Sequence, residues 1–197
     1  MKTSSTVVTL VIVGLLSISP AASAQDASLQ TAASFHGMSF EGSGMFLLPL
    51  GDPLKFGFGF RGACSFALHR GDMTKTSLSF ASGYIEHEYR DEEYDLPSTL
   101  SIVPLMLGFQ QSVGGKVRFH ANPMVGPLFV KSKACNEGLC FESNNEIKLG
   151  MMVDMGIKAN VKDGLTLSFC AGFMMYDLTS FSVPMSITFR FGIGYEI

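Results

Sequence analysis

The chain closes on Ser186-Ile-Thr-Phe-Arg-Phe-Gly-Ile-Gly-Tyr-Glu-Ile197, a stretch in which every second side chain is large and apolar. Successive side chains of a β-strand point to opposite faces, so this stretch predicts a strand with one apolar and one polar face. In a soluble protein the apolar face packs inward. In a membrane barrel it faces lipid, and the polar face lines the interior. The choice between these two orientations decides the fold.

The beginning of the chain has the features of an export signal. Lys2 precedes an apolar run, Val7–Leu16, which is shorter than the about 20 residues of a membrane-spanning helix. The small residues Ala22-Ser-Ala24 then form a cleavage motif. We therefore expect residues 1–24 to be a signal peptide that is removed, and residues 25–34 to be a flexible lead-in to the folded domain.

Alternation of apolar and polar residues recurs along the rest of the chain. Seven further segments show it, at about residues 38–48, 54–68, 76–88, 99–111, 116–131, 147–161 and 165–175. The segment 99–111 is apolar on both faces, and one face is expected to carry Val103, Leu105, Leu107 and Phe109 together.

Eight alternating segments of this length predict one closed antiparallel sheet. Each segment is long enough for the about 9–11 residues of a tilted membrane-spanning strand, and no segment after residue 24 has helical periodicity. Closing the sheet on itself removes its exposed edges. The sequence therefore predicts an all-β fold for residues 35–197, an eight-stranded antiparallel up-and-down transmembrane β-barrel.

Three features favour an apolar face that points outward, to lipid. The connections alternate between short turns and longer polar loops, as they do in outer-membrane barrels. The bore of an eight-stranded barrel is only just wide enough for side chains, so the many phenylalanines of the apolar face would not fit inside it. The opposite face is rich in Gly, Ala and Ser, and it also carries charged side chains. A lysine or arginine that faced lipid near the middle of the bilayer would destabilise the barrel by about 2–4 kcal/mol.

The charged residues of the polar face are expected to lie inside the barrel. Closure brings the first, second and last segments together, so we expect Glu41 to lie between Arg61 and Arg190 and to pair with both. The whole predicted interior network is Glu41, Lys55, Arg61, Arg118, Asp154, Lys158 and Arg190. It is interpreted either as a salt-bridge network that plugs the bore or as the lining of a narrow ion path.

Four cysteines follow the signal peptide. Cys135 and Cys140 flank a short polar stretch that contains glycine, and export permits a local disulfide between them. Two thiols supply only half of a tetrahedral metal site, so a metal is the less favoured interpretation. Cys64 and Cys170 lie within alternating segments and are expected to be packing residues.

The segment Lys148-Leu-Gly-Met-Met-Val-Asp-Met-Gly-Ile157 and the closing strand, together with the export signal, resemble the small outer-membrane barrels of Gram-negative bacteria, the OmpA/OmpX-like superfamily. The resemblance covers residues 35–197. It implies a porin-like barrel in the cell outer membrane, in contact with lipid and lipopolysaccharide. It also implies that the barrel-assembly machinery reads the closing strand through Phe189, Phe191, Ile193, Tyr195 and Ile197. This chain ends in Ile197, where the family pattern has an aromatic residue.

Nothing in the sequence indicates an enzyme. None of the histidines, His36, His69, His87 and His120, has the short His-x-Ser spacing of the outer-membrane lipid A deacylases. We place His120 in the interior and His87 in an acidic outer loop, 86–95. That loop is either a solvated surface or a site for divalent cations that bridge lipopolysaccharide.

Three functions remain open at this stage. The first is a structural or interaction role through the extracellular loops. The second is a small porin-like channel, and the third is a soluble periplasmic barrel that binds an apolar ligand. The formal net charge of −3 argues against a nucleic-acid partner. We expect a monomer without a metal or another cofactor.

Overall fold

The computed structural model describes residues 37–51, 54–91, 96–136, 139–178 and 184–197. The predicted signal peptide, 1–24, and lead-in, 25–34, lie outside the described residues. Within the described residues, no helix is long and apolar enough to cross a membrane. The strands are β1 (Met38–Pro49), β2 (Leu54–Arg70), β3 (Thr74–Asp91), β4 (Leu96–Gly114), β5 (Val117–Asn136), β6 (Leu139–Glu142), β7 (Glu146–Lys162), β8 (Leu165–Met175) and β9 (Met185–Glu196).

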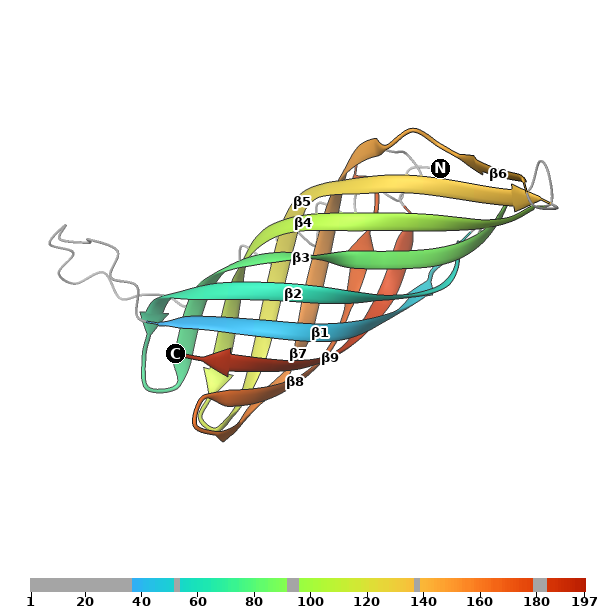
Figure 1. The fold of residues 1–197 in the computed structure, drawn as a ribbon. Helices are drawn as coiled ribbons and strands as arrows, with labels where there is room; N and C mark the ends of the chain where they lie inside the picture. The colour runs from blue at the N-terminus through green and yellow to red at the C-terminus, as the bar shows by residue number, and fades with distance from the viewer. Residues whose placement is uncertain (1–36, 52–53, 92–95, 137–138, 179–183) are drawn as a thin grey trace, which may run out of the picture. The chain divides into compact units, whose positions relative to one another are not determined.

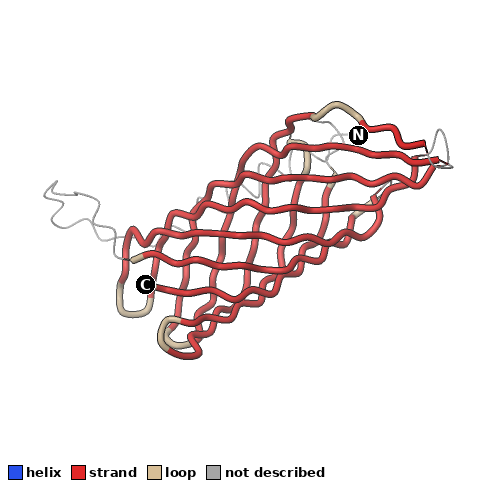
Figure 2. Tube along the Cα trace, in the orientation of Figure 1, coloured by secondary structure: helices blue, strands red, loops and turns tan. Residues whose placement is uncertain are grey.

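The strands form one closed antiparallel sheet (Figures 1 and 2). Their order is β4-β3-β2-β1-β9-β8-β7-β5-β6, and a further pairing of β4 with β5 completes the ring. The short β6 pairs with the end of β5 and takes no part in the ring. Eight strands therefore enclose the interior, and the prediction of an eight-stranded antiparallel barrel is confirmed.

The first and last strands are neighbours in the ring. β1 pairs with β9 from Ser39 opposite Glu196 to Pro49 opposite Ser186. The amide of Ile197 donates to the carbonyl of Met38 at 2.8 Å, which extends the seam to the final residue. The closing strand that predicts the fold from sequence is thus also the strand that closes the barrel.

The two rims of the barrel differ. One rim, called the turn end below, carries the short connections between β2 and β3, β4 and β5, and β7 and β8, together with Met38 and Ile197. At its tightest connection, Asp163 and Gly164 both have positive φ, 47° and 85°, as a two-residue hairpin requires. The other rim, called the loop end, carries the longer connections.

The apolar face of the alternating strands points outward. Phe56, Phe58 and Phe60 are exposed on β2, and Phe191 and Ile193 are exposed on β9. On β4 the expected set, Val103, Leu105, Leu107 and Phe109, is exposed as well. An apolar belt that is exposed around a closed barrel is stable in lipid and not in water. The interpretation as a soluble barrel with these side chains in its core is therefore wrong.

Two local departures from the prediction occur at the loop end. β3 continues to Asp91, so residues 86–91 of the predicted acidic loop are strand, and His87 lies within it. In β2 the register shifts between Leu54 and Gly57, and this bulge changes which side chains face inward. Leu54 packs against the buried interior, whereas Lys55 is exposed.

Candidate functional site

The interior of the barrel is the first candidate site, and its composition changes along its length. On β5 the inward residues near the turn end are polar: Arg118, His120 and Asn122. Further along the same face they become apolar, with Met124 and Leu128. The interior therefore has a polar half beside the turn end and an apolar half beside the loop end.

An ion pair crosses the barrel where the two halves meet. Arg61 Nη1 donates to Asp154 Oδ2 at 2.5 Å, and both side chains are almost fully buried. Arg61 is on β2 and Asp154 on β7, and three strands separate them on either side of the ring. The same guanidinium donates to the sulfur atoms of Met152 and Met124, at 3.4 and 3.5 Å. Arg61 thus joins opposite walls and contacts the apolar half.

Arg190 links this pair to Glu41. Its Nη2 lies 3.3 Å from Asp154 Oδ2, and its Nη1 lies 3.3 Å from Glu41 Oε1. Glu41 Oε2 is 3.9 Å from Lys158 Nζ. The expected pairing of Glu41 with Arg190 is therefore present.

The expected ion pair between Glu41 and Arg61 is not formed within the described residues, and that part of the prediction is wrong. The register places Glu41 opposite Ala63, so Arg61 lies one inward-facing position further from the turn end and reaches Asp154. The Glu41 side chain lies against Gly192. A Cβ atom at position 192 would lie only 3.0 Å from Glu41 Oε1.

A second group of charges gathers at the turn end around Glu196. Arg118 Nη2 lies 2.9 Å from its Oε2, and Lys158 Nζ and Lys75 Nζ lie 3.5 and 3.6 Å from its Oε1. Lys75 was absent from the predicted network because its strand alternates weakly there. Lys55 does not join either group, because the bulge in β2 exposes it at the loop end.

Cys170 is buried among these polar groups. Arg190 Nη2 donates to its sulfur at 3.1 Å, and His120 Nε2 lies 3.2 Å from the same atom. The described residues contain no group of three or more His, Cys, Asp or Glu side chains that could hold a metal ion.

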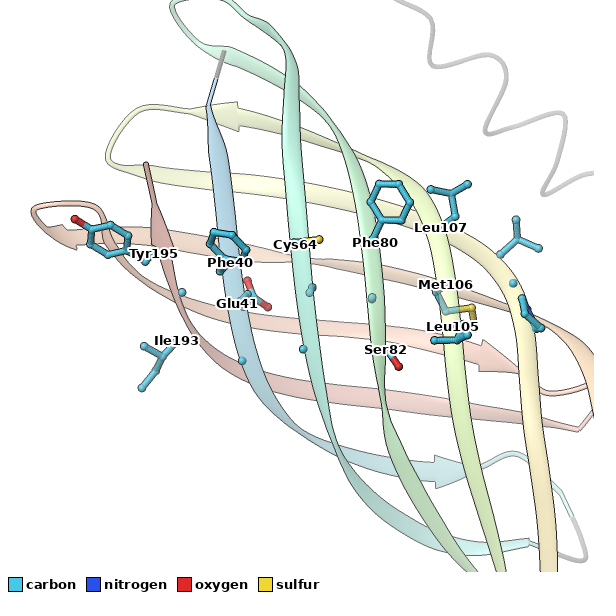
Figure 3. Close-up of a pocket in the computed structure, with 18 of the residues that line it drawn as sticks. Phe40, Glu41, Cys64, Phe80, Ser82, Leu105, Met106, Leu107, Ile193 and Tyr195 are labelled. Atoms are coloured by element: carbon cyan, nitrogen blue, oxygen red, sulfur yellow. The ribbon is translucent and has the colours of Figure 1, made fainter. Parts of the chain in front are cut away.

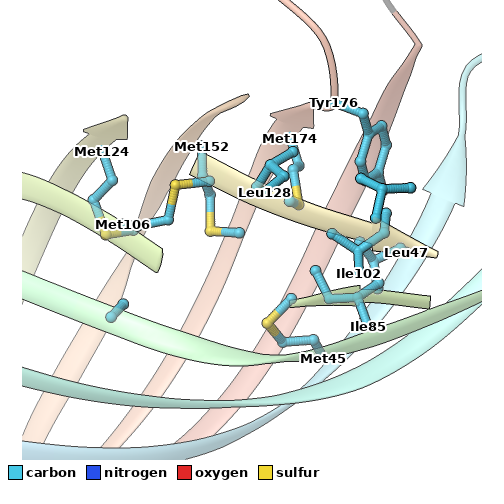
Figure 4. Packing of buried hydrophobic residues seen from close by; sticks show 12 residues of the cluster. Met45, Leu47, Ile85, Ile102, Met106, Met124, Leu128, Met152, Met174 and Tyr176 are labelled. Atoms are coloured by element: carbon cyan, nitrogen blue, oxygen red, sulfur yellow. The ribbon is translucent and has the colours of Figure 1, made fainter. Parts of the chain in front are cut away.

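The loop-end half of the interior is filled by apolar side chains (Figure 4). The cluster consists of Met45, Leu47, Ala81, Ile85, Ile102, Met106, Met124, Leu128, Val130, Met152, Met174 and Tyr176. Leu47, Ile85, Ile102 and Leu128 have no exposed surface. The cluster was not predicted from the sequence, although its members lie at the inward positions of the predicted strands.

A hydrogen-bonded chain of polar side chains crosses the barrel at the cluster's outer side. The hydroxyl of Tyr176 lies 2.7 Å from His87 Nε2 and 2.9 Å from Ser186 Oγ, and His87 Nδ1 lies 3.0 Å from the carbonyl oxygen of Lys55. β3, which carries His87, and β8, which Tyr176 follows, lie on opposite sides of the ring. His87 is fully buried, so its predicted place in a solvated loop is wrong. His87 lies two residues after Ile85, so the two side chains share one face of the strand, and this spacing could have predicted that His87 points inward.

A locked hairpin at the loop end is the second candidate site. Cys135 and Cys140 form the predicted disulfide, which joins β5 to β6. Phe141 of β6 is 67% exposed, beyond the closed part of the barrel. Lys131 Nζ donates to Glu142 Oε2 at 2.6 Å across the same hairpin, and this bond lowers the pKa of the Glu142 carboxyl. The hairpin therefore holds an aromatic ring between charged groups on a covalently fixed support.

The lipid-facing surface carries a shallow groove across β1, β2 and β3 (Figure 3). Its floor includes Gly42, Gly62 and Ser82, which lie opposite one another in the register. Phe40 and Phe80 border it. Because the groove lies within the apolar belt, acyl chains of the surrounding lipid are its neighbours.

No family model matches the chain, and no curated protein matches it in sequence. Among solved structures, it is similar to a major outer membrane protein from Thermus thermophilus, with a TM-score of 0.56 over 82% of this chain and 100% of that one, at 13% identity. Neisserial surface protein A gives a TM-score of 0.53 over 80% and 96% of the two chains, at 12% identity. Ail, the attachment invasion locus protein of Yersinia pestis, in complex with the heparin analogue sucrose octasulfate, gives 0.50 over 82% and 97%, at 15% identity.

The fold is that of a small outer-membrane barrel. The exposed apolar belt and the closed antiparallel ring agree with this, and together they place the protein in the cell outer membrane. A barrel with this fold presents one rim to the periplasm and one to the exterior, and short turns typically lie on the periplasmic side. By this pattern we assign the loop end, with the locked hairpin, to the extracellular side.

Proposed function

We propose that this protein has a structural and interaction role in the outer membrane, exercised through its extracellular rim, and that it is neither a pore nor an enzyme. The observation that carries the proposal is the ion pair between Arg61 and Asp154, which spans the full width of the interior. The apolar cluster beside it fills the loop-end half of the interior with buried hydrophobic side chains. An ion would have to shed its water to pass buried leucine and isoleucine side chains, which is strongly unfavourable.

The β5–β6 hairpin is the proposed contact surface for an external partner. Aromatic side chains are enriched at the centres of protein interfaces, and polar or charged groups surround them at the rim. Phe141, with Lys131 and Glu142 nearby, has this character, and the disulfide reduces the entropy that the hairpin would lose on binding.

The other proposed partners of the barrel are components of the cell envelope. Lipid and lipopolysaccharide surround the apolar belt. The barrel-assembly machinery recognises the outward side chains of β9, namely Phe189, Phe191, Ile193, Tyr195 and Ile197. The proposal takes the barrel as a monomer, and a ring that is complete within one chain supports this.

Conductance in planar bilayers tests the proposal against the porin-like alternative. The purified, folded barrel is expected to leave the bilayer electrically silent. Large, discrete and reproducible current steps would show that the interior opens, and the channel would replace the interaction role.

Orientation is tested in intact cells with a matched pair of lysines. Lys55 is exposed at the loop end, and the Lys162 side chain is 82% exposed at the turn end. In a Cys64→Ser background, a membrane-impermeant maleimide is expected to label Lys55→Cys and not Lys162→Cys. The reverse pattern would place the hairpin in the periplasm and exclude it as an external contact surface.

A further inference from the structure

A pocket opens at the extracellular rim, directly above the apolar cluster. Its volume is about 310 Å³, near the lower limit of small-molecule sites. It is lined by Leu54, Leu100, Ile102, Val130, Ser132, Ser143, Glu146, Lys148, Tyr176, Asp177 and Pro184. These residues come from β2, β4, β5, β7 and the segments next to β6, β8 and β9, so the pocket is enclosed by the barrel wall.

The floor of the pocket is apolar and closed. Ile102 has no exposed surface and Val130 has little, and both belong to the buried cluster. The bulge in β2 turns Leu54 inward to complete this floor with Leu100. A molecule that enters from outside therefore meets a blind apolar surface and cannot continue into the polar half of the interior.

The wall of the pocket carries two carboxylates and one ammonium group. Lys148 Nζ lies 3.4 Å from Glu146 Oε2 and 3.6 Å from Asp177 Oδ2. Both distances exceed those of close charge-assisted hydrogen bonds. The Lys148 side chain is 35% exposed and has room to move toward solvent. Among the described residues that line the pocket, two are acidic and one is basic.

We propose that this pocket binds a small molecule with an apolar body and an ammonium group. The apolar body lies on Leu54 and Leu100, which cover the buried Ile102, and the ammonium group pairs with Asp177 and Glu146 as Lys148 withdraws. An anionic ligand of the same shape would meet one lysine and two acids, so it binds more weakly. This site is separate from the hairpin and goes beyond the proposed interaction role.

The absence of tryptophan from the chain provides a clean reporter. Leu54→Trp places a single fluorophore at the pocket, and Val161→Trp places one on an exposed position at the turn end. Both variants are titrated in nanodiscs of zwitterionic lipid with phenethylamine, 2-phenylethanol and 3-phenylpropionate. Phenethylamine is expected to change the Leu54→Trp emission saturably, with an affinity about tenfold higher than that of 3-phenylpropionate. The Val161→Trp emission is expected to stay constant.

Further substitutions in the Leu54→Trp background assign the polar contacts. Asp177→Asn is expected to weaken phenethylamine binding about tenfold, the effect of losing one charged hydrogen bond. Lys148→Met removes the competing ammonium group and is expected to strengthen binding, whereas Lys162→Met, at the opposite rim, changes nothing. Phe141→Ala is expected to leave binding intact, so loss of the hairpin's role and loss of the pocket are distinguishable.

Three results would overturn the proposal. They are no saturable response in Leu54→Trp, equal or tighter binding of 3-phenylpropionate, and an equal response in Val161→Trp, which would indicate partition into lipid. If Leu54→Trp does not fold, the methyl NMR signal of Ile102 in the natural sequence decides. A saturable shift with phenethylamine supports the pocket, and an unchanged signal excludes it.

Discussion

Arg61 and Asp154 form an ion pair across the barrel, from strands that lie opposite each other in the ring. Most contacts in a β-barrel join neighbouring strands through backbone hydrogen bonds. This one joins β2 to β7 through side chains alone, at the boundary between the polar and the apolar half of the interior. It therefore constrains the shape of the ring as well as closing its bore.

Removing one partner of this pair is expected to cost about 3–5 kcal/mol, because an unpaired charge stays buried. Asp154→Leu should destabilise the barrel more than Arg61→Met, since Asp154 also neutralises Arg190. Urea titrations that follow the folded and unfolded bands on unheated gels measure both. The double variant Arg61→Met with Asp154→Leu should recover part of the loss. Additive losses in the double variant would show that the two side chains do not interact.

The apolar cluster is expected to contribute stability as a soluble core does. Leu128→Ala should cost about 2–5 kcal/mol, because a cavity remains where no lipid can enter. Leu149→Ala, on the lipid-facing side, should cost less, since acyl chains fill the vacated space. The same urea titrations apply. Equal costs would mean that the interior repacks or fills with water.

The lipid-facing orientation predicts a depth-dependent cost for added charge. Val125 and Val117 are both exposed on β5, the first well inside the belt and the second at the turn end. Val125→Arg should cost about 2–4 kcal/mol and Val117→Arg about 0–1 kcal/mol in refolding measurements with lipid vesicles. Similar small costs at both positions would contradict a lipid-facing β5.

The disulfide is expected to stabilise the hairpin and not the barrel. Replacing both Cys135 and Cys140 by Ser should increase cleavage of the hairpin by protease added to intact cells, while the folded band on unheated gels persists. Cys64→Ser serves as the control and should change neither readout. Loss of the folded band in the double variant would show that the barrel itself depends on the bond.

The end of the chain tests the assembly signal. Ile197→Phe restores the terminal aromatic of the resembling family and keeps the backbone bonds to Met38, so assembly should be unimpaired. Ile197→Asp should reduce the amount of folded barrel in outer-membrane fractions. Impaired assembly of Ile197→Phe would show that the terminal side chain is not read in this way.

The strand pattern made most of the fold predictable. Alternation in β2, β7 and β9 is regular, and even the ambiguous β4 exposes the predicted face. Asp163 and Gly164 are residue types typical of a two-residue hairpin turn, and both have positive φ. The disulfide between Cys135 and Cys140 followed from their spacing and the polar stretch between them.

The interior was harder to predict, since its contacts depend on register and on packing across the bore. Sequence alone placed Glu41 beside Arg61, but a shift of one inward position directs Arg61 to Asp154. The apolar cluster was missed because strand alternation was read as apolar outside and polar inside. Near the loop end both faces of β4 and β5 are apolar, and only the tertiary structure shows that the inward half fills the barrel.

The seam between β1 and β9 also limits when this barrel can form. β1 acquires its second neighbour only when β9 arrives, because the two strands pair and Met38 and Ile197 bond to each other. Folding during synthesis therefore cannot reach the closed state. All strands from β1 to β9 must be translated, carried across the inner membrane and kept from aggregating before the seam forms, a demand that pairings between residues so distant in sequence impose on any folding route.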